Sequence, residues 1–436
     1  MAAPFYAKII RIFISMDDSL ILRVFFNFIL VLIVSFFSLI ACANNHELDE
    51  QPFNLVSSQN PTQSSNPDPT KTSVKSSFKN KHEIAFQANH FSYAGPMAVL
   101  QLANDWNGKF KGGKDAISFV ETELSVRTNN VVLGYLRRIS HQFEIGNDLA
   151  RGFYYYNNEI ELDERMRINA AMDSKVYSGT GLRLGYRFES FFGSSFGNYL
   201  SVTPSLTALR LDNIIWGDFE GSLFYSNTDD WGGTIDLDYS YTKDHIVRRP
   251  LTGEYLGWLY GLDLNVDWDS PWLEASYKGI NVFSKIYWDG LPTTTAQFST
   301  ETAFLLYGYE YYEDVILNAP ALHYLEASTP LTFADSALKA FLIPKLYSIS
   351  QNMHFFSSAQ ITPIRSFYYH GFQYRTDPGV FGSNSPIKLG LQHDFSTRTT
   401  KLSMKHEYVS MEFASQTLDV SKSQQIVLKL GLHIQF

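Results

Sequence analysis

Two short groups of polar residues carry the side chains that acid–base catalysis needs. Asp244 and His245 place a general acid beside a general base, and Asp229 and Asp230 form a carboxylate pair. Adjacent residues of a strand point to opposite faces, so a strand would not bring Asp244 and His245 together on one substrate. In turns, solvated polar residues of these types are common. We therefore interpret both groups as turn residues and predict no catalytic residue.

Two histidines, His393 and His406, fall on neighbouring predicted strands but do not amount to a metal site. A bound zinc ion needs further ligands, and none stand near either histidine in the sequence. The single cysteine of the chain, Cys42, lies near the N-terminus, which excludes an intramolecular disulfide and a cysteine-based metal site. Motifs of phosphate-binding loops and serine hydrolases are absent as well. The sequence thus predicts no bound metal and no cofactor.

Charged residues are arranged instead along one side of several extended segments. Between residues 181 and 189, apolar side chains alternate with Arg183 and Arg187, and the segments 234–242 and 260–269 repeat the pattern with aspartates. A period of two is typical of a β-strand with one apolar and one polar face. The polar faces carry the charges that we predict to line an interior, namely Arg183, Arg187, Asp236, Asp238, Asp263, Asp267 and Asp269.

The segment 201–212 departs from this alternation. Its apolar positions are even-numbered up to Ala208 and odd-numbered from Leu209. One extra residue in a strand produces such a slip, and Pro204, which cannot donate a hydrogen bond to a neighbouring strand, also marks an irregularity. The sequence predicts a β-bulge in this segment, with Arg210 on the polar, interior face beyond the slip.

The final segment, 425–436, alternates in the same way and ends on an aromatic residue. It resembles the C-terminal strand of Gram-negative outer-membrane β-barrels, which the barrel assembly machinery recognises. The third position from the end, often aromatic in such strands, is Ile434 here. The resemblance implies a closing barrel strand with Lys429 and His433 facing the lumen; an ordinary amphipathic strand is the alternative. The implied membrane-insertion signal consists of Leu428, Leu430, Leu432, Ile434 and Phe436.

The first 42 residues have the layout of a secretory signal peptide. Basic residues precede an apolar run from 24 to 41, and polar residues follow. Residues 39–42, Leu-Ile-Ala-Cys, resemble the bacterial lipobox, which implies that Cys42 is lipidated. Cleavage by ordinary signal peptidase within Ala-Cys-Ala, and a retained anchor helix, are the alternatives. Residues 43–82 are polar and punctuated by proline, so we predict a disordered tether.

Composition narrows the class of the remaining chain, residues 83–436. The net charge of −9 and the pI near 5.7 argue against a nucleic-acid partner, because phosphate binding needs clustered Lys and Arg. The chain has 26 Tyr and 34 Phe, yet its mean hydropathy is slightly negative. Alternating strands with aromatic girdles give this combination in outer-membrane barrels. Together with the export signal and the final segment, composition favours that class over a soluble β-sandwich.

We therefore predict an all-β fold, a transmembrane antiparallel up-and-down barrel with apolar faces toward lipid and polar faces toward the lumen. At about ten residues per strand plus connections, the chain allows about 16 strands, with 14 to 18 as the range. Residues 395–398 are predicted as a periplasmic turn, and 375–386 and 410–423 as outer loops. The charged stretch 157–175 is predicted as a loop or an inward-folded segment.

Three functions fit such a barrel in the bacterial outer membrane. The first is a porin-like channel for small polar solutes, with selectivity set by charges in the lumen. The second is a hydrolase acting on lipid or peptide, and the third is a structural or surface-binding barrel without transport. Pairing of the same charges across strands, which would fill the lumen, is the alternative to a selective pore. Outer-membrane lipid and lipopolysaccharide are the expected partners, besides the assembly machinery.

Overall fold

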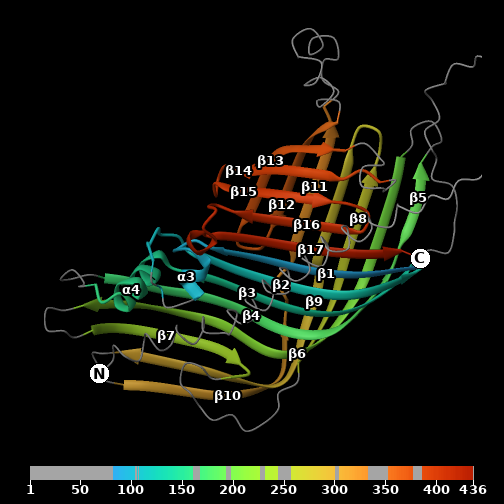
Figure 1. Ribbon diagram of the computed structural model, residues 1–436. Coiled ribbons are helices and arrows are strands. Elements are labelled where there is room, and N and C mark those ends of the chain that lie inside the picture. Colours follow the sequence, from blue (N-terminus) through green and yellow to red (C-terminus); the bar gives the residue numbers. More distant parts are fainter. Residues whose placement is uncertain are drawn as a thin grey trace, which may run out of the picture. The chain divides into compact units, whose positions relative to one another are not determined.

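The computed structural model describes most of the chain from His82 onward (Figure 1). The signal segment with Cys42, residues 43–81 of the predicted tether, both candidate catalytic pairs and Phe436 lie outside the described residues. The described residues are 82–103, 106, 108–160, 167–192, 198–225, 231–243, 257–299, 304–331, 352–376 and 385–435.

The described residues form 17 strands and three short helices. The helices are α3 (Val99–Ala103), α4 (Asn147–Asn157) and η2 (Val420–Lys422), and none of them is long and apolar enough to cross a membrane. The strands are β1 (His82–Ala94), β2 (Asp115–Thr128), β3 (Val131–Ile145), β4 (Arg167–Tyr186), β5 (Phe188–Phe192), β6 (Asn198–Tyr225), β7 (Trp231–Tyr241), β8 (Gly257–Asp269), β9 (Glu274–Ser299), β10 (Phe304–Leu317), β11 (Leu322–Pro330), β12 (Met353–Ile361), β13 (Ser366–Arg375), β14 (Lys388–Asp394), β15 (Thr399–Lys405), β16 (Val409–Ser415) and β17 (Gln425–Gln435).

The final strand closes the sheet into a barrel. β17 pairs antiparallel with β16 along one edge and with β1 along the other, and β1 continues to β2. Glu83 of β1 lies opposite Gln435 of β17, so the start of the first described strand and the end of the last one lie at the same end of the barrel. We call this the terminal end, and the opposite one the far end. The predicted closing role of the C-terminal strand is therefore confirmed.

Three strands continue a neighbour along the barrel wall and do not add to its circumference. β4 and β5 both pair with β6, β7 and β8 both pair with β6 and β9, and β10 and β11 both pair with β9. The fold is a closed antiparallel barrel of 14 strands with β5, β7 and β10 in addition. The prediction of about 16 strands is close, and 14 lies within the predicted range. The barrel has fewer strands than 16 because β6 has 28 residues and β9 has 26, where about ten suffice to cross a membrane.

The long strands carry a second, differently built region at the far end. There β7 pairs with the far-end parts of β6 and β9, and β10 pairs with the far-end part of β9. Figure 1 shows β7 and β10 on the same side as α4, away from the C-terminus. Leu149 and Phe153 of α4 pack with Phe219 of β6 and Ile235 of β7 in one buried apolar cluster. We call this region the far-end sheet. An apolar cluster under a short helix is how a water-soluble domain is held together.

The predicted bulge is present, but it lies at the end of its segment. The register between β4 and β6 shifts so that Ser178 pairs with Asn213 and Gly179 with Leu211, which leaves Asp212 as the extra residue. No slip occurs at Ala208. Instead, the same side of β6 faces inward throughout, and its residues change from polar to apolar at Leu209. In the sequence this change looks like a slip of phase.

Several predicted connections are wrong. One prediction is confirmed: the 395–398 turn and the 376–387 connection lie at opposite ends of the barrel. Residues 395–398 join β14 to β15 at the far end, and residues 376–387 join β13 to β14 at the terminal end. However, the 416–424 connection shares the far end with 395–398, and residues 409–415 are strand. The charged stretch 157–175 also contains strand, because β4 begins at Arg167.

The barrel interior as candidate functional site

Five of the eight predicted interior charges do lie on the inner side of the barrel wall. Arg183 and Asp263 are buried within it. Arg187 and Asp267 line a cavity at the terminal end, and Asp269 lines a smaller one of about 250 Å³ beside it. The prediction of which face of these strands points inward is therefore correct for these five residues. Their predicted role in selecting solutes stays a prediction.

The other three predicted charges face away from the interior. Arg210 is exposed and shares its side of β6 with Leu206, because the strand keeps its phase between these two residues. Asp236 and Asp238 are exposed on β7, whose buried side carries Ile235 and Tyr239. β7 belongs to the far-end sheet, where the apolar side is turned inward, so the rule that places polar faces in the lumen gives the wrong side there.

The centre of the interior is filled by an ionic network. Arg183 contacts Asp263 at 2.7 Å and also pairs with Glu123. Arg138, whose side chain is 0% exposed, lies 2.7 Å from Glu121 and 3.0 Å from Asp263. Buried charges are tolerated only when they are paired and hydrogen-bonded in this way. We define the ionic network as Glu121, Glu123, Arg138, Arg183, Asp263 and Lys278.

A local irregularity aims Asp263 into this network. The register between β8 and β9 shifts between Leu262 and Leu264, and Asn281 of β9 takes a positive φ of 54° at this point. Asn tolerates the left-handed conformation better than most residues. The backbone amide of Asn281 donates to Asp263 at 2.7 Å, while its side-chain oxygen accepts from Arg138 at 2.6 Å. One asparagine therefore supports both a carboxylate and a guanidinium of the network.

Other ion pairs connect strands that are not neighbours. Lys278 of β9 reaches Glu121 of β2 at 3.0 Å, although four barrel strands separate β2 from β9. On the other side, Lys405 of β15 pairs with Glu326 of β11, with three strands between them. The ammonium of Lys429 lies 4.8 Å from the ring of Tyr324, and these residues sit on β17 and β11. Such contacts span the lumen, which a pore full of water would not allow.

An aromatic layer follows on the far-end side of the network. Phe91 of β1 and Phe367 of β13 contact each other edge to face with 5.1 Å between ring centroids, across four intervening strands. Tyr93 makes a similar contact with Phe367, and the Arg365 guanidinium covers Tyr93 at 4.4 Å. Phe91 and Phe367 are at most 1% exposed. The described side chains therefore meet across the lumen in two layers, one of charged groups and one of aromatic rings.

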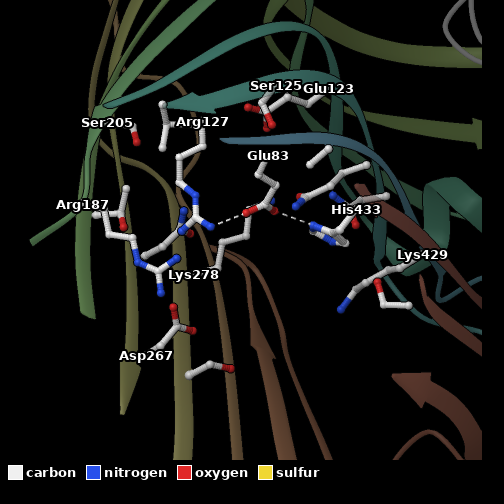
Figure 2. Close-up of a pocket in the computed structure, with 18 of the residues that line it drawn as sticks. Glu83, Glu123, Ser125, Arg127, Arg187, Ser205, Asp267, Lys278, Lys429 and His433 are labelled. Atoms are coloured by element: carbon white, nitrogen blue, oxygen red, sulfur yellow. Dashed lines mark hydrogen bonds and ion pairs between the residues drawn. The ribbon is translucent and has the colours of Figure 1, made fainter. Parts of the chain in front are cut away.

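A polar cavity of about 580 Å³ remains between the network and the terminal end (Figure 2). Glu83 stands at its mouth, held by Arg127 at 2.5 Å and by His433 at 2.9 Å, and Figure 2 shows these three side chains in line. Lys278 and Asp267 also line the cavity. Its walls thus offer both signs of charge, which suits small polar or zwitterionic solutes better than apolar ones.

The closing strand has the faces predicted for it, as far as it is described. Lys429 and His433 line the cavity, and Ile434 on the opposite side is 63% exposed. Leu428 and Leu432 are half-buried, and Leu430 is buried between neighbouring strands. Phe436 lies outside the described residues, and recognition of this strand by the assembly machinery stays a prediction.

Four of the six residues of the ionic network, Glu121, Glu123, Arg138 and Lys278, were not predicted from the sequence. Glu121 and Glu123 alternate with apolar residues in β2, which is the same signal that identified Arg183. Arg138 carried no such signal, because it follows Arg137 directly and only the strand phase tells which of the two points inward. Asn281 could not have been found, since its role depends on a bulge between two strands distant in sequence.

No group of three or more metal-ligating side chains occurs within the described ranges. No protein-family model and no curated protein matches the sequence. Among solved structures, the chain is similar to the translocator domain of the autotransporter NalP from Neisseria meningitidis, with 10% identity, 82% of this chain and 88% of that chain covered, and a TM-score of 0.23. It is also similar to OccAB3 of Acinetobacter baumannii (7%, 82% and 99%, 0.17) and to the outer membrane protease OmpT of Escherichia coli (6%, 82% and 97%, 0.19). With such low TM-scores, the fold rests on the chain's own strand pairing.

Proposed function

We propose that this protein is a bacterial outer-membrane barrel that keeps its lumen closed and presents the far-end sheet outside the membrane for surface binding. The observation that carries the proposal is the set of contacts across the lumen, above all Lys278 with Glu121. An open 14-stranded barrel would leave water between its walls, as wide barrels do. Here charged and aromatic side chains occupy that space. Interaction at the surface, without free diffusion through the barrel, fits this interior best.

The membrane location is supported by an apolar band around the barrel. Trp258 and Trp268 are both exposed on the outer side of β8, ten residues apart. With a rise of about 3.3 Å per residue and a strand tilt of about 40°, they mark a height of about 25 Å, which is that of the apolar band of outer-membrane barrels. Leu206 and Phe283 are exposed between these levels, at 65% and 71%. Tryptophan at both edges is typical of membrane interfaces.

The export route belongs to the same proposal. A signal peptide cleaved before Cys42, lipidation of that cysteine and recognition of the closing strand would bring the barrel to the outer membrane from the periplasm. The terminal end, where the tether begins, would then stay on the periplasmic side. The far-end sheet would face outward, together with the 395–398 turn, so this orientation is the reverse of the one predicted from the sequence for that turn and for the 375–386 loop. Mass measurement of the mature N-terminus tests the lipid directly, since Cys42→Ser should remove an added diacylglycerol.

The far-end sheet is the part of the barrel suited to binding. It stands beyond the apolar band, it has its own buried cluster, and its outer side is polar. Asp218 lies opposite Asp238, and Glu220 opposite Asp236, on neighbouring strands. Like charges facing each other lower the stability of a sheet. Spanning the membrane does not require these facing acidic residues, so they fit a role of the far-end sheet outside the membrane.

A porin-like channel is the second candidate, and the polar cavity favours it. The cavity opens toward the terminal end and is lined by both acids and bases, as an entrance for small polar solutes would be. Passage beyond it would require the ionic network and the aromatic layer to separate.

Planar-bilayer conductance of the refolded protein distinguishes the two candidates. The closed barrel should give no steady ohmic current. Truncating the aromatic layer with Phe91→Ala and Phe367→Ala should raise the frequency of brief openings, whereas Leu206→Ala on the outer surface, as the matched control, should not. A steady wild-type current would reject the closed barrel in favour of the channel. In that case Asp267→Asn, at the cavity wall, should lower the preference for cations.

A further inference from the structure

One carboxylate of the polar cavity at the terminal end stands apart from the others. Every lysine and arginine described in the cavity wall pairs with an acid. The pairs are Arg127 with Glu83, Arg183 with Asp263, Arg187 with Glu189, Lys278 with Glu121, Lys405 with Glu326 and Lys429 with Glu412. Asp267 has no ion pair and no hydrogen bond within the part of the chain that the structure describes. The cavity therefore offers a carboxylate that the chain's own cations leave uncompensated.

The bases near Asp267 are already engaged. Figure 2 shows Arg187 pointing toward Asp267, but its guanidinium contacts Glu189 at 2.8 Å and donates to the hydroxyl of Tyr199 at 2.8 Å. Lys405, which also lines the cavity, is held by its own ion pair. Neutralising Asp267 from within the chain would thus break an existing contact, whereas a cation bound in the cavity would not.

Two serines flank Asp267 on the neighbouring strands. Ser201 of β6 and Ser276 of β9 each lie directly opposite Asp267 of β8 in the register. Opposite residues of antiparallel strands are only about 5 Å apart, so both hydroxyls are within reach of a group that sits on the Asp267 carboxylate. Ser276 lines the cavity, and Ser201 shares its side of β6 with Thr203 and Ser205, which line it as well.

The hydroxyl of Ser201 lacks a hydrogen-bond partner. The residue is 0% exposed, and its Oγ makes no hydrogen bond within the described ranges. Buried polar atoms in folded proteins are nearly always hydrogen-bonded, so this oxygen indicates a donor that the chain itself does not supply. A serine hydroxyl turns readily between staggered rotamers, and a donor bound at Asp267 would satisfy it.

We infer that the cavity binds a primary ammonium group at Asp267, between Ser201 and Ser276. An ammonium carries one positive charge and three N–H donors, and one carboxylate with two hydroxyls offers a charge-assisted acceptor and two neutral ones. Asp267 and Ser276 also line the smaller cavity of about 250 Å³, so the rest of the ligand has room on either side. A simple alkylamine and the amino end of an amino acid or short peptide both carry this group. The site is separate from the proposed binding surface at the far end.

Ligand-observed NMR titration of the refolded full chain in detergent micelles tests this site. The probes are propylammonium, the zwitterion glycylglycine, and tetramethylammonium, which has the same charge but no N–H donor. We expect propylammonium to bind, with affinity about tenfold lower in Asp267→Asn and about threefold lower in Ser201→Ala, because a hydrogen bond to a carboxylate is stronger than one to a hydroxyl. Glu407→Gln is the matched control and should bind like wild type, since it removes an acid of the same cavity wall that already accepts a hydrogen bond from Ser385.

Two further readings support the site. Ser201→Ala should weaken binding without lowering the urea midpoint, because it deletes a buried hydroxyl that lacks a partner, and a purely structural serine would not behave in this way. Tighter binding of glycylglycine than of propylammonium would identify an amino acid or peptide end as the source of the ammonium. The reverse order would identify an alkylamine.

Four results would overturn the ammonium site. No binding of either ammonium probe by the wild type, or unchanged affinity in Asp267→Asn, rejects it directly. Equal affinity for tetramethylammonium shows that the N–H donors are not recognised, and an equal loss in Glu407→Gln shows only general attraction of cations. The conductance measurement is independent of this titration, because a steady current would reject the closed barrel and leave the affinity for propylammonium as it is. The two proposals can therefore fail separately.

Discussion

The two halves of β6 follow opposite rules. Near the terminal end, Leu206 is 65% exposed, while Thr207 beside it is buried and donates a hydrogen bond to Asp263 at 2.8 Å. Near the far end, Asp218 is exposed and Phe219 is 6% exposed within the apolar cluster under α4. A single strand thus turns its apolar side outward in one half and inward in the other.

Under the proposed membrane location, two surroundings along one strand, lipid and water, would account for the difference. A face in contact with lipid must be apolar, and in a barrel the polar face then turns to the lumen. A face in contact with water is free to be polar, and burial of the apolar face then stabilises the sheet. With the proposed membrane location, the inversion between Leu206 and Phe219 would place the membrane boundary on β6, close to Arg210 and the bulge at Asp212.

The interior of the membrane half should be the most sensitive part of the chain. Arg138→Met leaves Glu121 and Asp263 buried with one fewer cation, and breaking a buried pair in this way costs about 3–5 kcal/mol. We expect a lower urea midpoint for the refolded barrel, followed by tryptophan fluorescence. Arg398→Gln, an exposed arginine, is the control. An unchanged midpoint for Arg138→Met would mean that the ionic network does not hold the walls together.

A charge on the lipid-facing side should have the next largest effect. Leu206→Arg places a cation in the apolar band, which costs about 2–4 kcal/mol near the middle of a membrane and less toward its edge. Refolding yield into vesicles should fall accordingly. If Leu206→Arg refolds as well as wild type, this half of β6 does not meet lipid, and the comparison between the halves fails.

The smallest effect is expected on the outer side of the far-end sheet. Asp218→Asn relieves the like-charge contact with Asp238, so the free energy of unfolding should rise by a few tenths of a kcal/mol at most. Thermal unfolding at low salt, where surface charges are least screened, is the suitable measurement. A large loss of stability would show that Asp218 makes a contact that its exposure does not suggest.

The all-β fold and the closing role of β17 could be predicted because alternation is a local property. Arg183 and Asp263 were assigned to the interior on that basis alone. Arg210, Asp236 and Asp238 could not be placed, because alternation reveals two faces but not which solvent each one meets. In the proposed location, the surroundings of β6 change from lipid to water at a height that only the assembled barrel defines.

Strand number and lumen filling depend on long-range contacts in the same way. Nothing in the sequence of β9 shows that its last third pairs with β7 while its first third pairs with β8 and β11. The contact between Lys278 and Glu121 joins residues 157 positions apart, so a charged lumen and a filled one have the same sequence pattern.

Single-cysteine labelling along β6 tests the two-halves account most directly, because the Cys42→Ser background has no other cysteine. Two properties are measured in vesicles: the reaction of each cysteine with a water-soluble maleimide, and the response of a probe at that cysteine to a lipid-bound nitroxide. The variants compared are Leu206→Cys, Thr207→Cys, Asp218→Cys and Phe219→Cys. We predict that Asp218→Cys reacts with the maleimide, that a probe at Leu206→Cys responds only to the nitroxide, and that Thr207→Cys and Phe219→Cys are protected from both. Equal maleimide reactivity at positions 206 and 218 would contradict the account.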